Sequence, residues 1–228
     1  MSYLNTLLFG VYPYIAVAVM ILGSWARFDR DQYTWKAGSS QLLRNKDMRI
    51  ASNCFHVGVI FILLGHFVGL LTPEAIYHHF ISTGAKQVLA MVSGGFFGLI
   101  CLFGLVKLIQ RRMTDPRIRA TSSTSDIVVL WLLLVQLILG LLTILSSTQH
   151  LDGSVMVMLA NWAQSIVTFQ AFDAAASIAP VGIIYKLHVF FGLTLLLVFP
   201  FTRLVHIISA PVWYLGRSYQ IVRQKNHV

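Results

Sequence analysis

The sequence predicts an all-α integral membrane protein with five transmembrane helices, and three observations support this fold class. Hydrophobic residues make up 57% of the chain and charged residues only 11%, against about 25% in soluble domains. The mean hydropathy is +0.73. The charges leave five long uncharged runs, at residues 1–26, 50–73, 87–106, 127–151 and 187–202. Because about 20 apolar residues of helix cross a bilayer core, each run predicts one span, the last with its flanks included. A disordered chain, a disulfide-stapled secreted module and a typical soluble enzyme are excluded.

The limits of the spans follow from these runs. We place them at about residues 4–26, 50–72, 87–110, 127–149 and 183–206, within one transmembrane domain that covers residues 1–228. Met1–Arg27 lacks the basic start and the small-residue cleavage site of a signal peptide, so we expect a retained first span. The cysteines, Cys54 and Cys101, are isolated within spans, which gives no support to a disulfide, a zinc site or a cysteine-ligated cluster.

The basic residues predict the orientation, because Lys and Arg are retained on the cytoplasmic side of a membrane. They gather in the first connection, the third connection and the tail: Arg27, Arg30, Lys36, Arg44, Lys46 and Arg49; Lys107, Arg111, Arg112, Arg117 and Arg119; Arg203, Arg217, Arg223 and Lys225. The other two connections hold one each, Lys86 and Lys186. We therefore expect an N-terminus outside and a C-terminus inside.

The net charge of +9 belongs to this arrangement. No contiguous basic face lies outside the inner segments, so we expect no nucleic-acid partner. The basic inner surface instead predicts docking of soluble subunits or of anionic lipid headgroups.

An uncharged segment at 154–171 is nearly long enough to be a further span. If it crossed the membrane, the basic tail would lie outside, against the charge rule. Four polar residues fall on one side of a helix drawn through this segment: Asn161, Gln164, Ser165 and Thr168. We interpret it as an amphipathic helix on the outer surface.

Histidines inside the spans are the chemical signal. His56 and His66 lie in the second span, and His188 and His206 lie in the fifth. A polar ring in hydrocarbon is costly and usually has a partner or a function. The remaining four, His78, His79, His150 and His227, fall in connections or the tail, where a solvated histidine needs no special role.

The direction of the spans predicts how these histidines pair. The second span runs outward and the fifth inward, so antiparallel packing opposes His66 to His188 near the outer face and His56 to His206 near the inner face. Each pair can supply both axial nitrogens of one haem iron. His188 and His206 are 18 residues apart, about five turns of a continuous helix, but Pro200 between them can bend or break it.

The four histidines have three other possible roles. A proton relay or a carboxylate-bridged metal pair requires Asp or Glu inside the spans, and none is there. A structural role, with each ring bonded to a neighbouring carbonyl, stays open. Glycines near the histidines leave room for a flat macrocycle, but glycine also serves close helix packing in membranes. They are Gly58, Gly65, Gly69 and Gly192. Arg111, Arg112 and Arg203 are candidate contacts for haem propionates at the inner end, or equally ordinary charges of the inner connections.

Several stretches along the chain resemble one family. They are VYPYIA at 11–16, GSWARFDRDQYTWKAGSSQ at 23–41, FHVG at 55–58, GHFVGLLTP at 65–73, RRMTDPRIRAT at 111–121, QHLDG at 149–153, WAQSIVTF at 162–169, and LHVFFG and FPFTRLVH in the fifth span. In this order they resemble the gamma subunit of membrane-bound respiratory nitrate reductase, a dihaem cytochrome b. The resemblance covers nearly the whole chain.

The resemblance implies a specific function. Such a subunit lies in the bacterial inner membrane and oxidises quinol, menaquinol or ubiquinol, near the outer face. It holds two b-type haems, whose ligands match His66 with His188 and His56 with His206. Electrons pass to a cytoplasmic iron–sulfur beta subunit and then to a molybdenum-containing alpha subunit that reduces nitrate. The matching quinol-site positions are Gly65, His66 and Lys86.

Two alternative functions stay open at this stage. One is the cytochrome b subunit of another respiratory oxidoreductase, such as a hydrogenase, a formate dehydrogenase or a ferric reductase. The other, from a different class, is a small transporter with structural histidines. For Lys86, a hydrogen bond to quinol or to a propionate competes with a simple anchoring role at a helix end.

Overall fold

The computed structural model describes residues 3–36, 38, 40, 43, 47–149, 151–209 and 216. Several residues named above lie outside the described residues: His150, His227, Arg44, Lys46, Arg217, Arg223 and Lys225.

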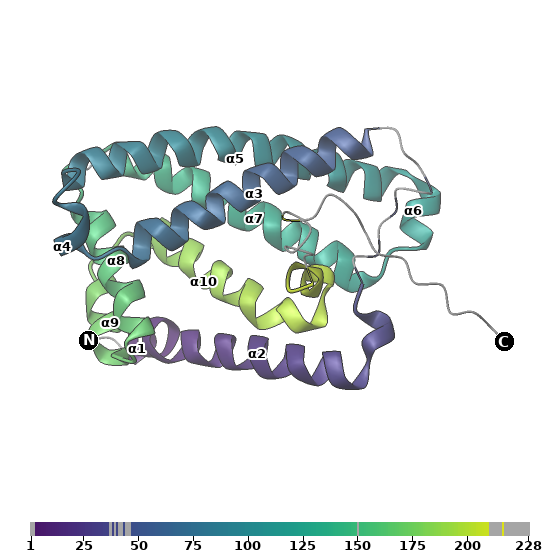
Figure 1. Cartoon of the computed structure of the whole chain (residues 1–228), viewed down its shortest axis with the longest axis horizontal. Coiled ribbons are helices and arrows are strands. Elements are labelled where there is room, and N and C mark those ends of the chain that lie inside the picture. Colours follow the sequence, from purple (N-terminus) through teal and green to yellow (C-terminus); the bar gives the residue numbers. More distant parts are fainter. Residues whose placement is uncertain are drawn as a thin grey trace.

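Five long helical segments form the body of the protein (Figure 1). The first is continuous through α1 (Tyr3–Thr6), the π-helical η1 (Leu7–Val11) and α2 (Tyr12–Arg30); the others are α3 (Met48–Leu71), α5 (Thr83–Thr114), α7 (Thr124–Ser147), and α10 (Ile183–Val198) with η3 (Phe199–Phe201). All five are long and apolar enough to cross a membrane. The prediction of an all-helical protein with five such helices is confirmed.

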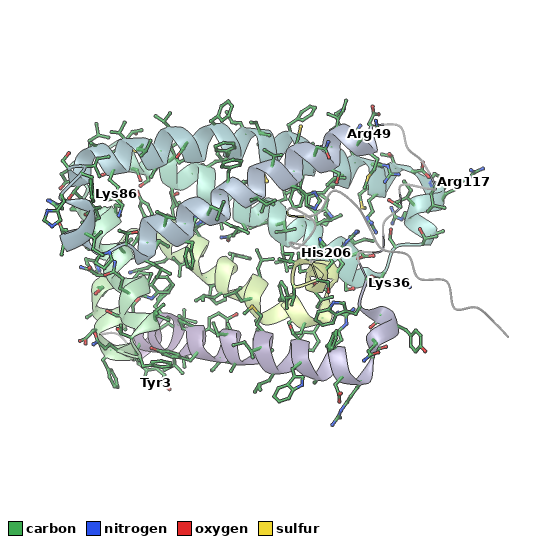
Figure 2. The ribbon with its side chains drawn as sticks, in the orientation of Figure 1. Tyr3, Lys36, Arg49, Lys86, Arg117 and His206 are labelled. Carbon is green, nitrogen blue, oxygen red and sulfur yellow. The ribbon has the colours of Figure 1, made fainter. Side chains whose placement is uncertain are left out.

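Short elements cap the two ends of this bundle (Figure 1). One end carries α4 (Glu74–Tyr77), α8 (Ser154–Val167) and α9 (Ala171–Ile178). The opposite end carries η2 (Gln32–Thr34), α6 (Pro116–Ala120) and η4 (Arg203–Ile207). We call these the α8 end and the α6 end. Figure 2 places Lys86 at the α8 end and Lys36, Arg49 and Arg117 toward the α6 end.

The helix starts follow local sequence rules. The Ser123 hydroxyl accepts from the amide of Asp126 at 3.2 Å, and the Asp126 carboxylate accepts from the Ser123 amide, which is a capping box at the start of α7. Ser82 caps α5 by accepting from the Ala85 amide. Asp115 caps α6, whose first residue is Pro116. These caps explain why helices begin a few residues before the uncharged runs.

The long helices pack side by side in the order α2, α10, α7, α5, α3. The closest approach is between α3 and α5, where glycines replace side chains. A Cβ on Gly104 would lie 2.4 Å from the Phe55 backbone nitrogen, and one on Gly58 would lie 2.6 Å from the Cβ of Cys101. Small residues let transmembrane helices approach in this way. Large apolar side chains such as Leu63, Leu99 and Leu145 stay more than half exposed on the outside, as lipid-facing residues do.

The α8 end is a packed layer. The Trp162 indole donates to the carbonyl of Phe9 at 2.9 Å, and the Asn5 amide donates to the carbonyl of Ala175 at 3.1 Å. Gln164, expected on the polar side of an amphipathic helix, donates to the carbonyl of Leu70 at the end of α3. The helix ends at Val167, where Phe169 takes a positive φ of 62°, so the expected segment 154–171 divides between α8 and the start of α9.

The structure differs from the expected fifth span, 183–206, at its inner end. The helix narrows to a 3-10 turn at Pro200 and stops, and Thr202 is extended with φ −123° and ψ 178°. Proline has no amide hydrogen to continue the helix. The Thr202 hydroxyl then accepts from the Leu204 amide and starts η4, which carries His206. His188 and His206 therefore do not share a face of one continuous helix.

Candidate functional site

Two pairs of histidines face each other across the bundle. The ring centroids of His66 on α3 and His188 on α10 lie 5.9 Å apart, and those of His56 on α3 and His206 on η4 lie 6.4 Å apart. The structure brings together the same partners that the span directions pair. His66 lies toward the α8 end, and His56 lies toward the α6 end with the labelled His206 (Figure 2).

The spacing within each pair suits one metal ion between two rings. A metal–nitrogen bond is about 2 Å long, so two imidazoles on opposite sides of one metal place their centroids about 6 Å apart. The distances of 5.9 and 6.4 Å agree with this value. Because aromatic rings in ordinary contact also have centroids about 4.5–7 Å apart, the spacing is compatible with a shared metal, and the direction of the ring nitrogens supplies a second observation.

Each of the four rings has its Nδ1 atom directed at a backbone carbonyl. The partners are Ser52 for His56 at 2.7 Å, Ile62 for His66 at 2.8 Å, Gln136 for His188 at 3.2 Å and Arg203 for His206 at 2.5 Å. Since a carbonyl only accepts, Nδ1 carries the hydrogen, and Nε2 is left with a free lone pair. Histidine ligands are held in this way in metal sites, where the second nitrogen donates to a carbonyl or carboxylate.

These contacts address the structural role that the sequence left open. A carbonyl bond occupies only one nitrogen of each ring, and the hydrogen bonds among the described residues do not involve the four Nε2 atoms. Within the described ranges, no group of three or more His, Cys, Asp or Glu could hold a metal ion. Each histidine pair offers only two ligands. This suits a metal that is already bound by a cofactor, as iron is bound by the porphyrin of haem.

The glycines singled out in the sequence divide into two kinds. Gly65 and Gly69 have open space within 4 Å of a Cβ added to them, so they leave room beside His66. A Cβ added to Gly58 would clash with α5, and one added to Gly192 would lie 3.1 Å from Gln136 Nε2. The first two fit space for a bulky ligand, while the other two serve helix contacts. On α7, Gly140 leaves room for the His188 ring, because a Cβ added there would lie 3.0 Å from His188 Cε1.

Lys86 lies next to these open positions. Its ammonium donates to the carbonyl of Gly69 at 3.0 Å and lies 3.7 Å from the centroid of the Tyr77 ring. The cation therefore rests between a backbone dipole and an aromatic face at the end of α3. Gly65, His66 and Lys86, the expected quinol-site positions, come from the same end of α3 and α5 (Figure 2).

The three expected propionate contacts gather at the α6 end. Arg111 and Arg112 are buried; Arg111 donates to the hydroxyl and carbonyl of Ser40, and Arg112 donates to Ser122 and to Asp126 at 3.3 Å. Burial lowers the pKa of Arg203, with Arg112 lowering it further and Asp126 raising it, so these charges lie close together. Two guanidinium groups, Arg112 and Arg203, therefore lie near the Asp126 carboxylate at this end.

Other contacts of the site have no signature in the sequence. The carbonyls of Ser52, Ile62 and Gln136 belong to residues whose type does not matter, so no motif marks them. Arg27 donates to the carbonyls of Pro200 and Thr202, whereas the sequence marks it only as a basic residue of the first connection. Of the remaining histidines, His78 bonds to Glu74 and Thr83, and His79 is exposed.

The fold and the site together define a multi-pass helical membrane protein with two facing histidine pairs, one toward each end of its bundle. The chain belongs to the nitrate reductase gamma subunit family, whose sequence model matches residues 5–225. It is therefore the membrane-anchored subunit of a multi-subunit oxidoreductase complex.

Close relatives agree over nearly their whole length. The chain is 50% identical over 226 residues to respiratory nitrate reductase 1 gamma chain of Escherichia coli, with 99% of this chain and 100% of the relative covered. It is 49% identical to respiratory nitrate reductase 2 gamma chain of the same organism, covering 98% and 99%. It is 35% identical to the nitrate reductase gamma chain of Bacillus subtilis, covering 96% and 98%. Neither the transporter alternative nor another respiratory oxidoreductase is favoured by these relatives.

Proposed function

We propose that this subunit oxidises quinol near the α8 end and delivers electrons at the α6 end through two b-type haems. His66 and His188 hold one haem, and His56 and His206 hold the other. The observation that carries the proposal is the pair of ring separations, 5.9 and 6.4 Å, with every Nδ1 bonded to a carbonyl. Bound haem supplies one-electron redox chemistry, and the protein supplies the ligands and the apolar surroundings that set its potential.

Quinol binds in the open space beside Gly65. His66 and Lys86 lie at the same end of the bundle. The Lys86 ammonium is a donor for a quinol oxygen, and its bond to the Gly69 carbonyl holds it in place. Menaquinol and ubiquinol each have two hydroxyl groups that these donors and acceptors can bind.

The α6 end faces the cytoplasm in this proposal, because the basic residues gather there. The N-terminus is then outside and the C-terminus inside the bacterial inner membrane, and α8 with α9 lies on the outer surface. The iron–sulfur beta subunit and the molybdenum-containing alpha subunit dock at the α6 end, where anionic lipid headgroups also bind. Arg111, Arg112 and Arg203 balance the two carboxylates of the inner haem's propionates.

A reduced-minus-oxidised visible spectrum of membranes that carry the complex tests this proposal. We expect bands of low-spin haem in the wild type. His66→Ala and His188→Ala should each remove the same one of two components, and His56→Ala and His206→Ala the other. His79→Gln, an exposed histidine of the same end, is the control and should leave both components unchanged. A colourless wild type, or four alanine variants with unchanged spectra, would contradict the proposal.

A further inference from the structure

A hydrogen-bonded chain of side chains leads from Tyr77, beside Lys86, to the surface of the α8 end. The Tyr77 ring lies under the Lys86 ammonium, and its hydroxyl is 3.2 Å from the hydroxyl of Thr83. Thr83 Oγ1 is 2.8 Å from His78 Nε2, which is 2.9 Å from Glu74 Oε1. All four residues belong to α4, the turn after it and the first turn of α5.

The exposure of these residues changes along the chain. Tyr77 is 7% exposed, whereas the side chains of His78 and Glu74 are 49% and 53% exposed. Each link is within hydrogen-bond distance. A buried hydroxyl therefore connects, through one further hydroxyl, to an imidazole that water reaches.

We propose that Tyr77, Thr83 and His78 carry protons from quinol to the outer surface. This inference rests on the proposed function, because it needs quinol at Lys86. Oxidation of one quinol to quinone breaks two O–H bonds and releases two electrons and two protons. The electrons go to the ferric haems of the proposal, one at a time, and the protons need acceptors of their own.

The atoms for each proton transfer are present in this chain. A proton from quinol reaches the Tyr77 hydroxyl, which passes its own proton to Thr83 Oγ1. The Thr83 hydroxyl proton moves to the lone pair of His78 Nε2, and the resulting imidazolium releases its Nε2 proton to water through Glu74 Oε1, which is 2.9 Å away. Imidazole is suited to this step because its ring nitrogens can both accept and donate a proton.

The charged groups around His78 come from three elements. Glu74 is on α4, and Lys86 is on α5, above the ring of Tyr77. The connection before α8 holds Asp152, and a Cβ added to its neighbour Gly153 would lie 2.4 Å from Thr83 Cγ2. Of these charged groups, the Glu74 carboxylate is in direct contact with His78, at 2.9 Å from Nε2.

Substitutions at Thr83 and His78 test the route in the complete complex. Thr83→Val keeps the shape of the side chain but removes the hydroxyl, and Thr83→Ser keeps the hydroxyl. We expect Thr83→Val and His78→Gln to slow quinol oxidation about tenfold at neutral pH, since a positioned proton carrier contributes at least that much. Thr83→Ser should restore the rate. The neighbouring His79, exposed and without a hydrogen bond or ion pair to the described part of the chain, gives the control His79→Gln.

Three readouts separate the outcomes. The visible spectrum after chemical reduction shows whether each variant assembles. The pH profile of quinol oxidation should lose its His78-dependent limb in His78→Gln, and the solvent deuterium isotope effect should rise in Thr83→Val. Wild-type rate and pH profile in both variants would overturn the proton route alone. A wild-type complex that does not oxidise quinol would overturn the proposed function and this inference together.

Discussion

Arg27 on α2 donates from Nη1 to the backbone carbonyls of Pro200 and Thr202, at 2.6 and 2.9 Å. These carbonyls stand where the fifth long helix breaks and η4 begins. The same guanidinium reaches the Thr34 carbonyl and hydroxyl. One side chain therefore ties the first connection to the break that directs η4 and His206 toward His56.

Loss of this contact should affect one haem only. In Arg27→Gln we expect the His56/His206 component of the spectrum to weaken or shift in redox titration, while the His66/His188 component stays. Hydrogen bonds from a charged donor contribute about 1.5–3 kcal/mol each, and Arg27→Lys should retain part of that contribution. Arg30→Gln, an exposed arginine on the same helix, is the control. Equal changes in both components would contradict a local role for Arg27.

Lys86 should contribute to quinol affinity. Removal of its ammonium in Lys86→Ala takes away a charged donor, and we expect KM for quinol to rise about tenfold, which corresponds to about 1.4 kcal/mol. Lys86→Arg should fall between this variant and the wild type. Lys186→Ala removes a lysine that binds the Ala179 carbonyl at the same end, and it should leave KM unchanged. Steady-state assays of quinol oxidation measure KM for each variant. An unchanged KM in Lys86→Ala would show that Lys86 only anchors the helix end.

Close packing of α3 on α5 should make Gly104 intolerant of a methyl group. The added Cβ would lie 2.4 Å from the Phe55 nitrogen and 2.6 Å from the Ala51 carbonyl oxygen, both backbone atoms. Forced expansion of a packed interface costs about 1–3 kcal/mol, so we expect Gly104→Ala to lower the thermal midpoint of the purified complex. Gly94→Ala on the same helix meets only an ordinary contact at 3.9 Å. Similar midpoints for the two variants would contradict the packing argument.

The ion pair between Arg112 and Asp126 should stabilise the α6 end. Their side chains are 8% and 18% exposed, and the N–O distance is 3.3 Å. Removing one partner of a buried pair leaves an uncompensated charge, at a cost of about 3–5 kcal/mol. Asp126→Asn should therefore unfold at a clearly lower temperature than Asp29→Asn, an exposed aspartate at the same end. The loss should be smaller if a bound propionate shares the arginine, so haem-loaded and haem-depleted samples are to be compared by thermal unfolding.

The sequence alone predicted the parts that depend on local composition. Uncharged runs of about 20 residues are set by the thickness of a membrane, so five helices could be placed before any contact was known. The pairing of His66 with His188 followed from the alternation of span directions, which basic connections determine. The family followed from stretches spread along the whole chain.

Contacts between residues far apart in the chain were decided only by the tertiary structure. Pro200 signalled a break, but the direction of the chain after it depends on Arg27, 173 residues earlier, and on the Thr202 cap. Similarly, Gln136 supplies a carbonyl to His188 because α7 packs on α10. Backbone carbonyls are common to all residues, so hydropathy and motif spacing carry no signal for them. The sequence thus determined which histidines lie within the spans. The tertiary structure decided which of them face each other and, for His188, which carbonyl its Nδ1 meets, because these contacts depend on how separate helices pack.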